Sequence, residues 1–504
     1  MPANDRTPII IGVAQVEQRT DDPLAASAPL ALMKQAVRAA AEDCGGGATL
    51  LRAVDSIRVI RGIWDYGNPA RAIAEDIGAP GAQTGLTSLG GNYVQAVTNR
   101  SFLDLQAGHH DVIVVCGAEC GRTQAKARKA GINLDWNPPP PPPGGSPVSS
   151  KLGEDPPEFF LGSNKITRHP AELERGIERP IQFYPIFETA LRHANGETVA
   201  GHLERVSELW AGFNEVAVNN PHAWIRTPMT AEQIRTPSPS NRPVSFPYTK
   251  LMNSNNSVDQ GSALILTTTG TAKRLGISPE LWVYPHAGTE AWDHLYVSER
   301  DSLSESPAIR TAGRRLFDMT GVTPDDLNHV DLYSCFPAAV QVSAKELGLS
   351  LTRPLTVTGG LTFAGGPLNN YVMHAVARTV ELLRGKPNEI GLVTANGGLL
   401  TKHALCIYSA RPPSTPFQWA DLQEEVDAMP RRAVHTSFTG DVTIESYVVM
   451  FGADGPSVAH AACRANDGGR AWANVHDGDT LDAMMQEEFC GRAARLTADG
   501  TLSL

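Results

Sequence analysis

Hydrophobic positions in the first 120 residues follow two alternating patterns. Short apolar runs at 8–13, 54–60 and 111–117 are typical of buried strands. Between them, residues 29–41 carry apolar side chains at helical spacing, and glycines follow both this helix and a second one predicted over 93–106. Strands that alternate with helices predict a mostly parallel, doubly wound α/β sheet.

The same alternation recurs after residue 281. Because the order of elements repeats, we predict an internal structural duplication, although the residues themselves show no repeat. The predicted strands of this second unit are 329–332, 390–394 and 404–409, and its predicted helices are 306–320, 337–347 and 371–384.

Two further segments depart from this pattern. An insertion after residue 120 holds six prolines at 138–143, which predict a polyproline II stretch in a solvated loop, and then helices over 186–195 and 199–218. After residue 412 short strands alternate with Gly-rich turns, which predicts a small antiparallel β-barrel. The predicted division is 1–120 with 246–280 for the first half, 121–245 for the insertion, 281–412 for the second half and 413–504 for the barrel.

Length, charge and cysteine usage narrow the classes of function. A chain of 504 residues, 41% of them hydrophobic, is long enough for roughly two to four folded domains. Its net charge of −11 disfavours nucleic-acid binding. The seven scattered cysteines lack zinc-site spacing and suit free thiols in a reducing cytoplasm. We expect no secretory signal, because the N-terminus lacks a basic stretch followed by an apolar run, and no membrane span, because no segment approaches about 18 apolar residues.

Residues 90–119 read GGNYVQAVTNRSFLDLQAGHHDVIVVCGAE. This segment resembles the thiolase segment in which a nucleophilic cysteine starts a helix, Ala-Gly ends it and an apolar strand leads to Gly-Ala-Glu. Over residues 8–410 the chain is therefore similar to the thiolase superfamily, and its 330–336 element resembles that of the sterol carrier protein thiolases. The tail resembles that of the proteins called thiolase-like protein type 1. The other motifs that carry the resemblance are PIIIGVAQ at 8–15, NPHAW at 220–224, VDQGSAL at 258–264, VDLYSCF at 330–336 and the glycines of 359–367.

The resemblance implies a fold and a class of ligand. The fold is a duplicated thiolase fold of two βαβαβαββ halves in five αβαβα layers, with a helical and loop insertion and an additional β-barrel. Members of the family are called acetyl-CoA acetyltransferases, which are acyltransferases of lipid metabolism. The resemblance implies that acyl-CoA binds through the helical insertion and that no metal or other cofactor is needed. The family default is a homodimer that pairs through the sheet beside the nucleophile loop; the altered loop and the added barrel also allow a monomer.

The positions that a thiolase uses for chemistry hold other residues here. The resemblance places the nucleophilic cysteine at Gly90, the histidine of the 330–336 element at Tyr333, the second histidine at Gly366 and the late cysteine at Ala395. A thiolase needs an activated thiolate and a residue that moves the α-proton. We therefore predict a degenerate active site and no thiolase activity.

A substrate-binding shell is still expected around these positions. The turn at 90–92 (Gly-Gly-Asn) opens a predicted helix, so that its free N–H groups could form an oxyanion hole; alternatively, the glycines only make a tight turn. Gly366, Asn396 and Gly397 complete the candidate binding residues.

Tyr333 and His403 are the candidate catalytic residues. The resemblance extends to thiolase-like proteins that lack the cysteine and act as aldolases on hydroxyacyl-CoA with tyrosine acids and bases, so one alternative is a carbon–carbon lyase that uses Tyr333. His403 could be a base if the final glycine loop borders the pocket, or could face solvent at a strand edge beside Lys402. The other alternative is a non-catalytic acyl-CoA-binding or scaffold protein, which a pocket filled by its own side chains would favour.

Overall fold

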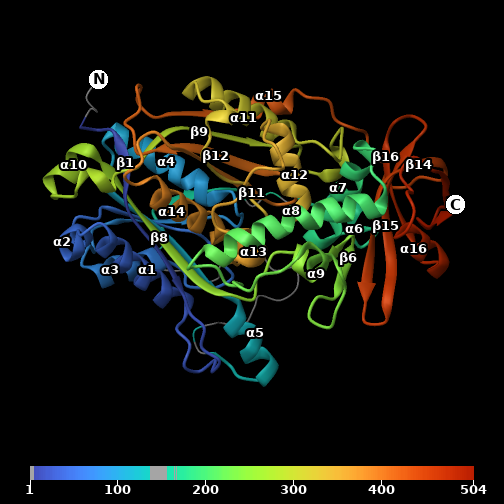
Figure 1. Cartoon of the computed structure of the whole chain (residues 1–504), viewed down its shortest axis with the longest axis horizontal. Coiled ribbons are helices and arrows are strands. Elements are labelled where there is room, and N and C mark those ends of the chain that lie inside the picture. The colour runs from blue at the N-terminus through green and yellow to red at the C-terminus, as the bar shows by residue number, and fades with distance from the viewer. Residues whose placement is uncertain (1–4, 135, 137–155, 164, 166, 504) are drawn as a thin grey trace.

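The computed structural model describes residues 5–134, 136, 156–163, 165 and 167–503. Figure 1 shows layered sheets and helices that form most of the molecule, with a separate sheet at the C-terminal end. The proline run at 138–143 lies outside the described residues. Among the described residues, no helix combines the length and the apolar character needed to span a lipid bilayer.

The first sheet has the strand order β1-β8-β4-β2-β3-β5. β8 enters from the opposite direction after the insertion and is antiparallel to both β1 and β4, whereas β4, β2, β3 and β5 are parallel neighbours. The sheet is therefore mixed: its parallel part agrees with the prediction, and the two antiparallel pairs of β8 were not predicted. The strands are β1 (Pro8–Glu17), β2 (Ser56–Val59), β3 (Gln83–Thr87), β4 (Val112–Cys120), β5 (Phe159–Leu161) and β8 (Asp259–Thr268).

The second sheet repeats the central pairing of the first. Its order is β10-β11-β12-β9-β13, in which β9–β12 and β12–β11 are antiparallel and β11–β10 is parallel. The pairs β1–β8, β8–β4 and β4–β2 have the same senses, so the predicted duplication is confirmed. The strands are β9 (Tyr284–Trp292), β10 (His329–Asp331), β11 (Ile390–Gly397), β12 (Lys402–Ser409) and β13 (Gln418–Asp421).

Two helices form the layer between the sheets. α4 (Tyr93–Ala107) and α14 (Tyr371–Leu383) contact strands of both sheets. α4 buries polar as well as apolar side chains, because its amides find partners across the layer: Gln95 Nε2 donates to the Tyr408 hydroxyl at 2.8 Å. α1 (Pro29–Asp43) packs on the first sheet, and α11 (Pro307–Thr320) packs on the second. This arrangement places the N-terminus of α4 beside the ends of the central strands.

The tail folds as an antiparallel sheet rather than a closed barrel. Its order is β16-β15-β14-β17-β18, and β14 also pairs with β6 of the insertion. Among the described residues, one isolated bridge between Asn474 and Thr501 joins the edges, and β18 is only two residues long, so no ladder closes the barrel. The strands are β14 (Gly440–Gly452), β15 (Gly455–Ala465), β16 (Arg470–Val475), β17 (Ala493–Leu496), β18 (Leu502–Ser503), β6 (Pro243–Phe246) and its partner β7 (Tyr248–Thr249).

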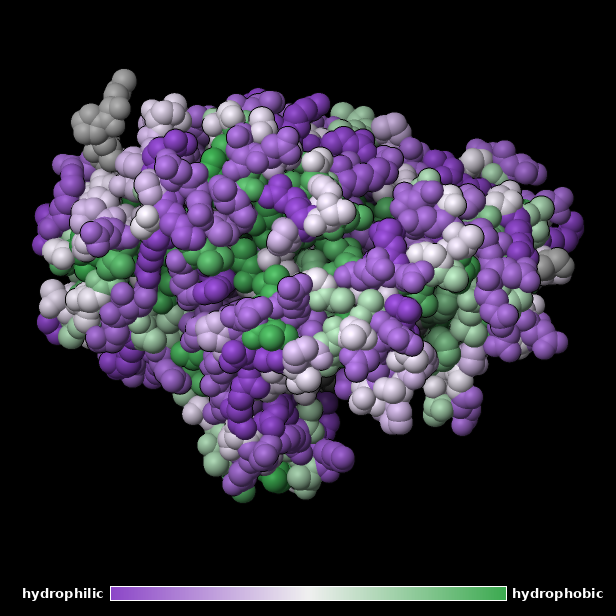
Figure 2. Space-filling view, in the orientation of Figure 1, coloured by the Kyte–Doolittle hydropathy of each residue, from purple (hydrophilic) through white to green (hydrophobic). Residues whose placement is uncertain are grey.

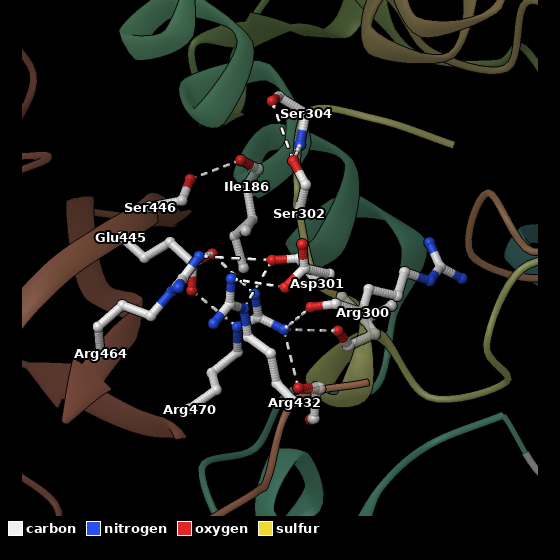
Figure 3. Close-up of polar contacts among 12 residues, drawn as sticks. Ile186, Arg300, Asp301, Ser302, Ser304, Arg432, Glu445, Ser446, Arg464 and Arg470 are labelled. Carbon is white, nitrogen blue, oxygen red and sulfur yellow. Dashed lines mark hydrogen bonds and ion pairs between the residues drawn. The ribbon is translucent and has the colours of Figure 1, made fainter. Parts of the chain in front are cut away.

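Buried polar contacts attach this tail to the rest of the chain (Figure 3). Arg470 is fully buried, pairs with Glu445 at 2.7 Å and donates to the carbonyls of Val297, Ser298 and Arg300. The Ser446 hydroxyl donates to a carbonyl of α7 (Pro180–Ala194) at 2.5 Å. The tail is therefore packed as part of the body.

Candidate functional site

The fold brings together most of the candidate residues from distant parts of the sequence. The turn at 90–92 lies between β3 and α4, Tyr333 follows β10, and Asn396 and Gly397 end β11. A Cβ atom on Gly91 would lie 2.5 Å from the Tyr333 hydroxyl and 2.6 Å from the Asn396 carbonyl oxygen. A Cβ atom on Gly397 would have the amide oxygen of Asn92 as its closest neighbour. The positions named from the sequence thus meet at one point.

Gly366 lies in a loop that is held by amides. Its N–H donates to the Asn255 carbonyl at 2.9 Å, and the amide oxygen of Asn256 lies 3.1 Å from the point where a Gly366 Cβ would stand. From the same loop, the Asn369 side chain accepts the Gly90 N–H at 3.1 Å. One N–H group of the expected oxyanion hole is therefore already paired within the chain.

Tyr333 is buried beside a second tyrosine that sequence reasoning did not assign. The Tyr333 and Tyr371 rings meet edge to face with centroids 5.7 Å apart. Tyr371 donates to Asp331 at 2.9 Å, and burial raises the pKa of the Asp331 carboxyl to about 6. Burial, with Cys335 nearby, raises the pKa of Tyr333 well above its usual range. Tyr333 therefore keeps its proton at neutral pH and can act as a hydrogen-bond donor but not as a base.

Aromatic side chains fill the space next to Asn396. The Tyr184 hydroxyl accepts hydrogen bonds from the Asn396 amide and from the Leu400 N–H, both at 3.0 Å. The Tyr184 ring stacks on Phe336 at 4.3 Å, and Phe336 in turn packs against Tyr248 at 5.7 Å. Sequence reasoning missed this stack, because Tyr184 comes from a helix of the insertion and its apolar neighbours gave no sign of the site.

His403 and Lys402 border this group, because they pair with Asn396 and Gly397 across β11 and β12. His403 is buried and contacts Asp293, with Nε2 3.3 Å from a carboxylate oxygen. Adjacent residues of a strand point to opposite faces, so Lys402 lies on the other face of β12. There its ammonium lies 4.6 Å from the Trp292 ring and 5.3 Å from the Tyr93 ring, and burial lowers its pKa. Neither residue faces solvent, so the strand-edge interpretation was wrong.

The groups at the meeting point are amides, phenols and the thiol of Cys335, whose sulfur lies 3.9 Å from the Asn396 amide nitrogen and whose pKa burial raises to about 12. Carboxamides donate and accept hydrogen bonds, but they do not attack a thioester or carry a proton. In the part of the chain that the structure describes, the amide oxygens of Asn92 and Asn396 are buried without a hydrogen-bond partner. Such acceptors are satisfied by a bound donor, so this point can hold a polar group.

An open groove lies beside this interior. It has a volume of about 830 Å³ and runs between α8 (Val199–Asn219) and residues 351–357, with β10 and α14 as its other walls. Figure 2 shows hydrophobic side chains gathered across the middle of the face where Figure 1 labels α14 and α8. The apolar lining includes Leu209, Phe213, Val216, Leu351, Leu355 and Leu382, and the charged lining includes Arg205, Arg353, Arg378, Glu208 and Glu215.

Comparisons with known proteins agree with this geometry. Residues 421–501 match the family model of the thiolase-like protein type 1 additional C-terminal domain. A crystal structure of a monomeric SCP2-thiolase like protein type 1 from Mycobacterium smegmatis is 29% identical, with all of both chains covered and a TM-score of 0.82. The chain therefore has a thiolase-like fold, and its tail matches the thiolase-like protein type 1 domain. The family resemblance stated from the sequence is thereby confirmed.

More distant relatives share parts of the thiolase-like chain. The acetyl-CoA acetyltransferase of Methanothermobacter thermautotrophicus is 26% identical over 220 residues, which are 39% of this chain and 55% of the relative. That of Methanocaldococcus jannaschii is 25% identical over 146 residues, 29% of this chain and 36% of the relative. The chain thus spans 55% of the length of the first relative and 36% of the length of the second. The peroxisomal thiolase of Saccharomyces cerevisiae shares the fold, with a TM-score of 0.57 and 13% sequence identity. The superposition covers 81% of this chain and 98% of the thiolase.

Proposed function

We propose that this thiolase-like protein binds an acyl-CoA-type ligand and carries out no thiolase chemistry. The observation that carries the proposal is the filled interior. Asn92 is the neighbour of Gly90 and Asn256 that of Gly366, Tyr333 packs on Gly91, and the Tyr184–Phe336–Tyr248 stack closes the space beside them. The thiol at the meeting point is that of Cys335, which contacts the Asn396 amide at 3.9 Å; burial raises its pKa to about 12, so it stays protonated and is a poor nucleophile for forming an acyl-enzyme.

The ligand then binds in the groove beside α8. A volume of about 830 Å³ is in the range of small-molecule sites, and its mixture of apolar side chains and arginines suits an acyl chain joined to a polyanionic head. Arg205 and Arg378 lie at this groove, and each is also paired with a glutamate, at 2.6 Å and 2.8 Å. Glu208 and Glu215 on α8 oppose an anion, so we expect the phosphates near residues 353–378 rather than along the helix.

Calorimetric titration of acetyl-CoA and a medium-chain acyl-CoA tests the binding half of the proposal. A thiolysis assay with acetoacetyl-CoA and CoA tests the other half: we expect no cleavage and, by intact-mass spectrometry, no acylated protein. Turnover at a rate typical of enzymes would overturn the proposal. The seven free cysteines support placing the chain in a reducing cytoplasm.

A carbon–carbon lyase is the second candidate function. It is favoured by the contact between Tyr333 and Tyr371, with Asp331 behind it, because a phenol supported by a second phenol and a carboxyl can donate to a ligand oxygen. An aldolase complex, Ltp2-ChsH2(DUF35), shares the fold with a TM-score of 0.59 at 19% identity. Release of an aldehyde from a hydroxyacyl-CoA by the wild type, and its loss in Tyr333→Phe, would support this function over pure binding.

A further inference from the structure

Three side chains of the kinds that bind zinc meet where the tail packs against the insertion. His193 lies in the last turn of α7, and Glu488 and Cys490 lie in the loop that precedes β17. One ligand atom from each residue lies within 4.8 Å of the other two. His193 lies 295 residues before Glu488 in the chain, so the fold and not a local motif brings the three together.

The surroundings of the three residues suit a cation. His193 is exposed, Glu488 is half-buried and Cys490 is buried, so solvent can reach the cluster. The 15-residue helix α7 ends directly after His193, and the C-terminal end of a helix carries partial negative charge that favours a cation.

Arg192 also contacts Glu488, so its hydrogen bonds use part of the carboxylate that the ion would need. Its guanidinium donates to both carboxylate oxygens, at 3.0 Å and 3.1 Å, and the Cys490 N–H donates to one of them at 2.8 Å. Each carboxylate oxygen has a second lone pair, and carboxylates that bind metals are regularly held by such outer partners. Arg192 would therefore orient Glu488 while leaving a lone pair for the ion.

We propose that His193, Glu488 and Cys490 form a binding site for a zinc-type divalent cation that ties the tail to α7. Imidazole, carboxylate and thiolate are all zinc ligands, and three protein ligands leave a fourth, solvent-facing position for water. On binding, the Cys490 S–H bond breaks, the thiolate binds the ion and the proton passes to solvent, so the apparent affinity rises with pH. Tetrahedral ligands at about 2.0–2.3 Å from zinc lie somewhat closer together than 4.8 Å, so binding would draw the three side chains together.

Cobalt provides the most specific test, because a thiolate bound to Co²⁺ has a charge-transfer absorption that other ligands lack. Reduced full-length protein titrated with Co²⁺ should show this band at one ion per chain, and Zn²⁺ should displace it. Cys490→Ala should abolish the band. His193→Ala should weaken Zn²⁺ binding by more than the about 10–100-fold that loss of an outer partner causes.

His109→Ala is the matched control, because His109 is an exposed histidine outside the cluster. It should bind Zn²⁺ as the wild type does. If Cys490→Ala fails to fold, the exposed His193→Ala variant and the wild-type spectrum still decide the question. Co²⁺ binding without the thiolate band, or equal Zn²⁺ affinity in His193→Ala and the wild type, would overturn the proposal.

Discussion

The hydroxyl of Tyr333 lies 2.5 Å from the point where a side chain on Gly91 would begin. This is well inside van der Waals contact, and the Asn396 carbonyl oxygen is 2.6 Å from the same point. The tyrosine that the resemblance places at a family histidine position is thus packed against the turn that it places at the nucleophile position. The two substitutions fit one another sterically.

Gly91→Ala should destabilise the fold by about 1–3 kcal/mol, because the methyl group would overpack against a hydroxyl and a backbone carbonyl. Chemical denaturation measures this change. Gly81→Ala is the control, since its Cβ would meet nothing within 4 Å. If Gly91→Ala were as stable as Gly81→Ala, the close packing of Tyr333 on the turn would be refuted.

Arg470→Met should cost about 3–5 kcal/mol of unfolding free energy, because it removes a fully buried charge that serves Glu445 and three backbone carbonyls. Arg495→Met is the control: its pair with Asp441 is exposed, so we expect little change. Equal denaturation midpoints for the two variants would show that the tail does not depend on the contacts in Figure 3.

Glu119 should make stability depend on pH. Burial raises the pKa of its carboxyl from 4.5 to about 8, so the folded chain holds the proton more tightly than the unfolded chain. The resulting stabilisation is complete below 4.5 and is lost as the pH rises through about 8, by about 1 kcal/mol per pH unit between these values. Glu119→Gln mimics the protonated form and should flatten the slope measured by denaturation at pH 6 and 8, whereas the exposed Glu42→Gln should not. An unchanged slope in Glu119→Gln would contradict the assignment.

The chain should be a monomer in solution. β5 pairs with β3, the strand that leads into the 90–92 turn, and thereby occupies the sheet edge through which the family forms its dimer. Light scattering should return the chain mass of 54.0 kDa. A mass near twice this value at micromolar concentration would show that another surface pairs.

Sequence patterns predicted the elements of the two halves closely. The helix expected over 93–106 is Tyr93–Ala107, and the strand expected over 390–394 continues to Gly397. Apolar spacing and glycines after helices are local signals, so they predict secondary structure whatever residues stand at the site. The prediction of a closed barrel was wrong. Turn signals indicate where strands end, but they do not show that the last strand, only two residues long, is too short to pair with the first and close the sheet.

In the candidate site, only the residues that lie within recognisable motifs could be predicted from the sequence. Tyr333 and the 90–92 turn were found because they occupy positions of the resemblance. Tyr184 and Asn256 were missed, since nothing in their local sequence shows which interior they enter. The cluster at His193 was excluded by cysteine spacing, a rule that does not apply to ligands far apart in the chain.

The central claim is that an acyl-CoA-type ligand binds in the groove beside α8. Gly212 lines this groove, and a Cβ there would meet nothing within 4 Å, so a larger side chain fits without strain. The deciding measurement is a calorimetric titration of a medium-chain acyl-CoA into the wild type, Gly212→Trp and Gly212→Ala. We predict equal binding by the wild type and Gly212→Ala, and at least tenfold weaker binding by Gly212→Trp, which would fill the groove. No binding to the wild type at millimolar concentration, or equal binding by all three proteins, would contradict the account.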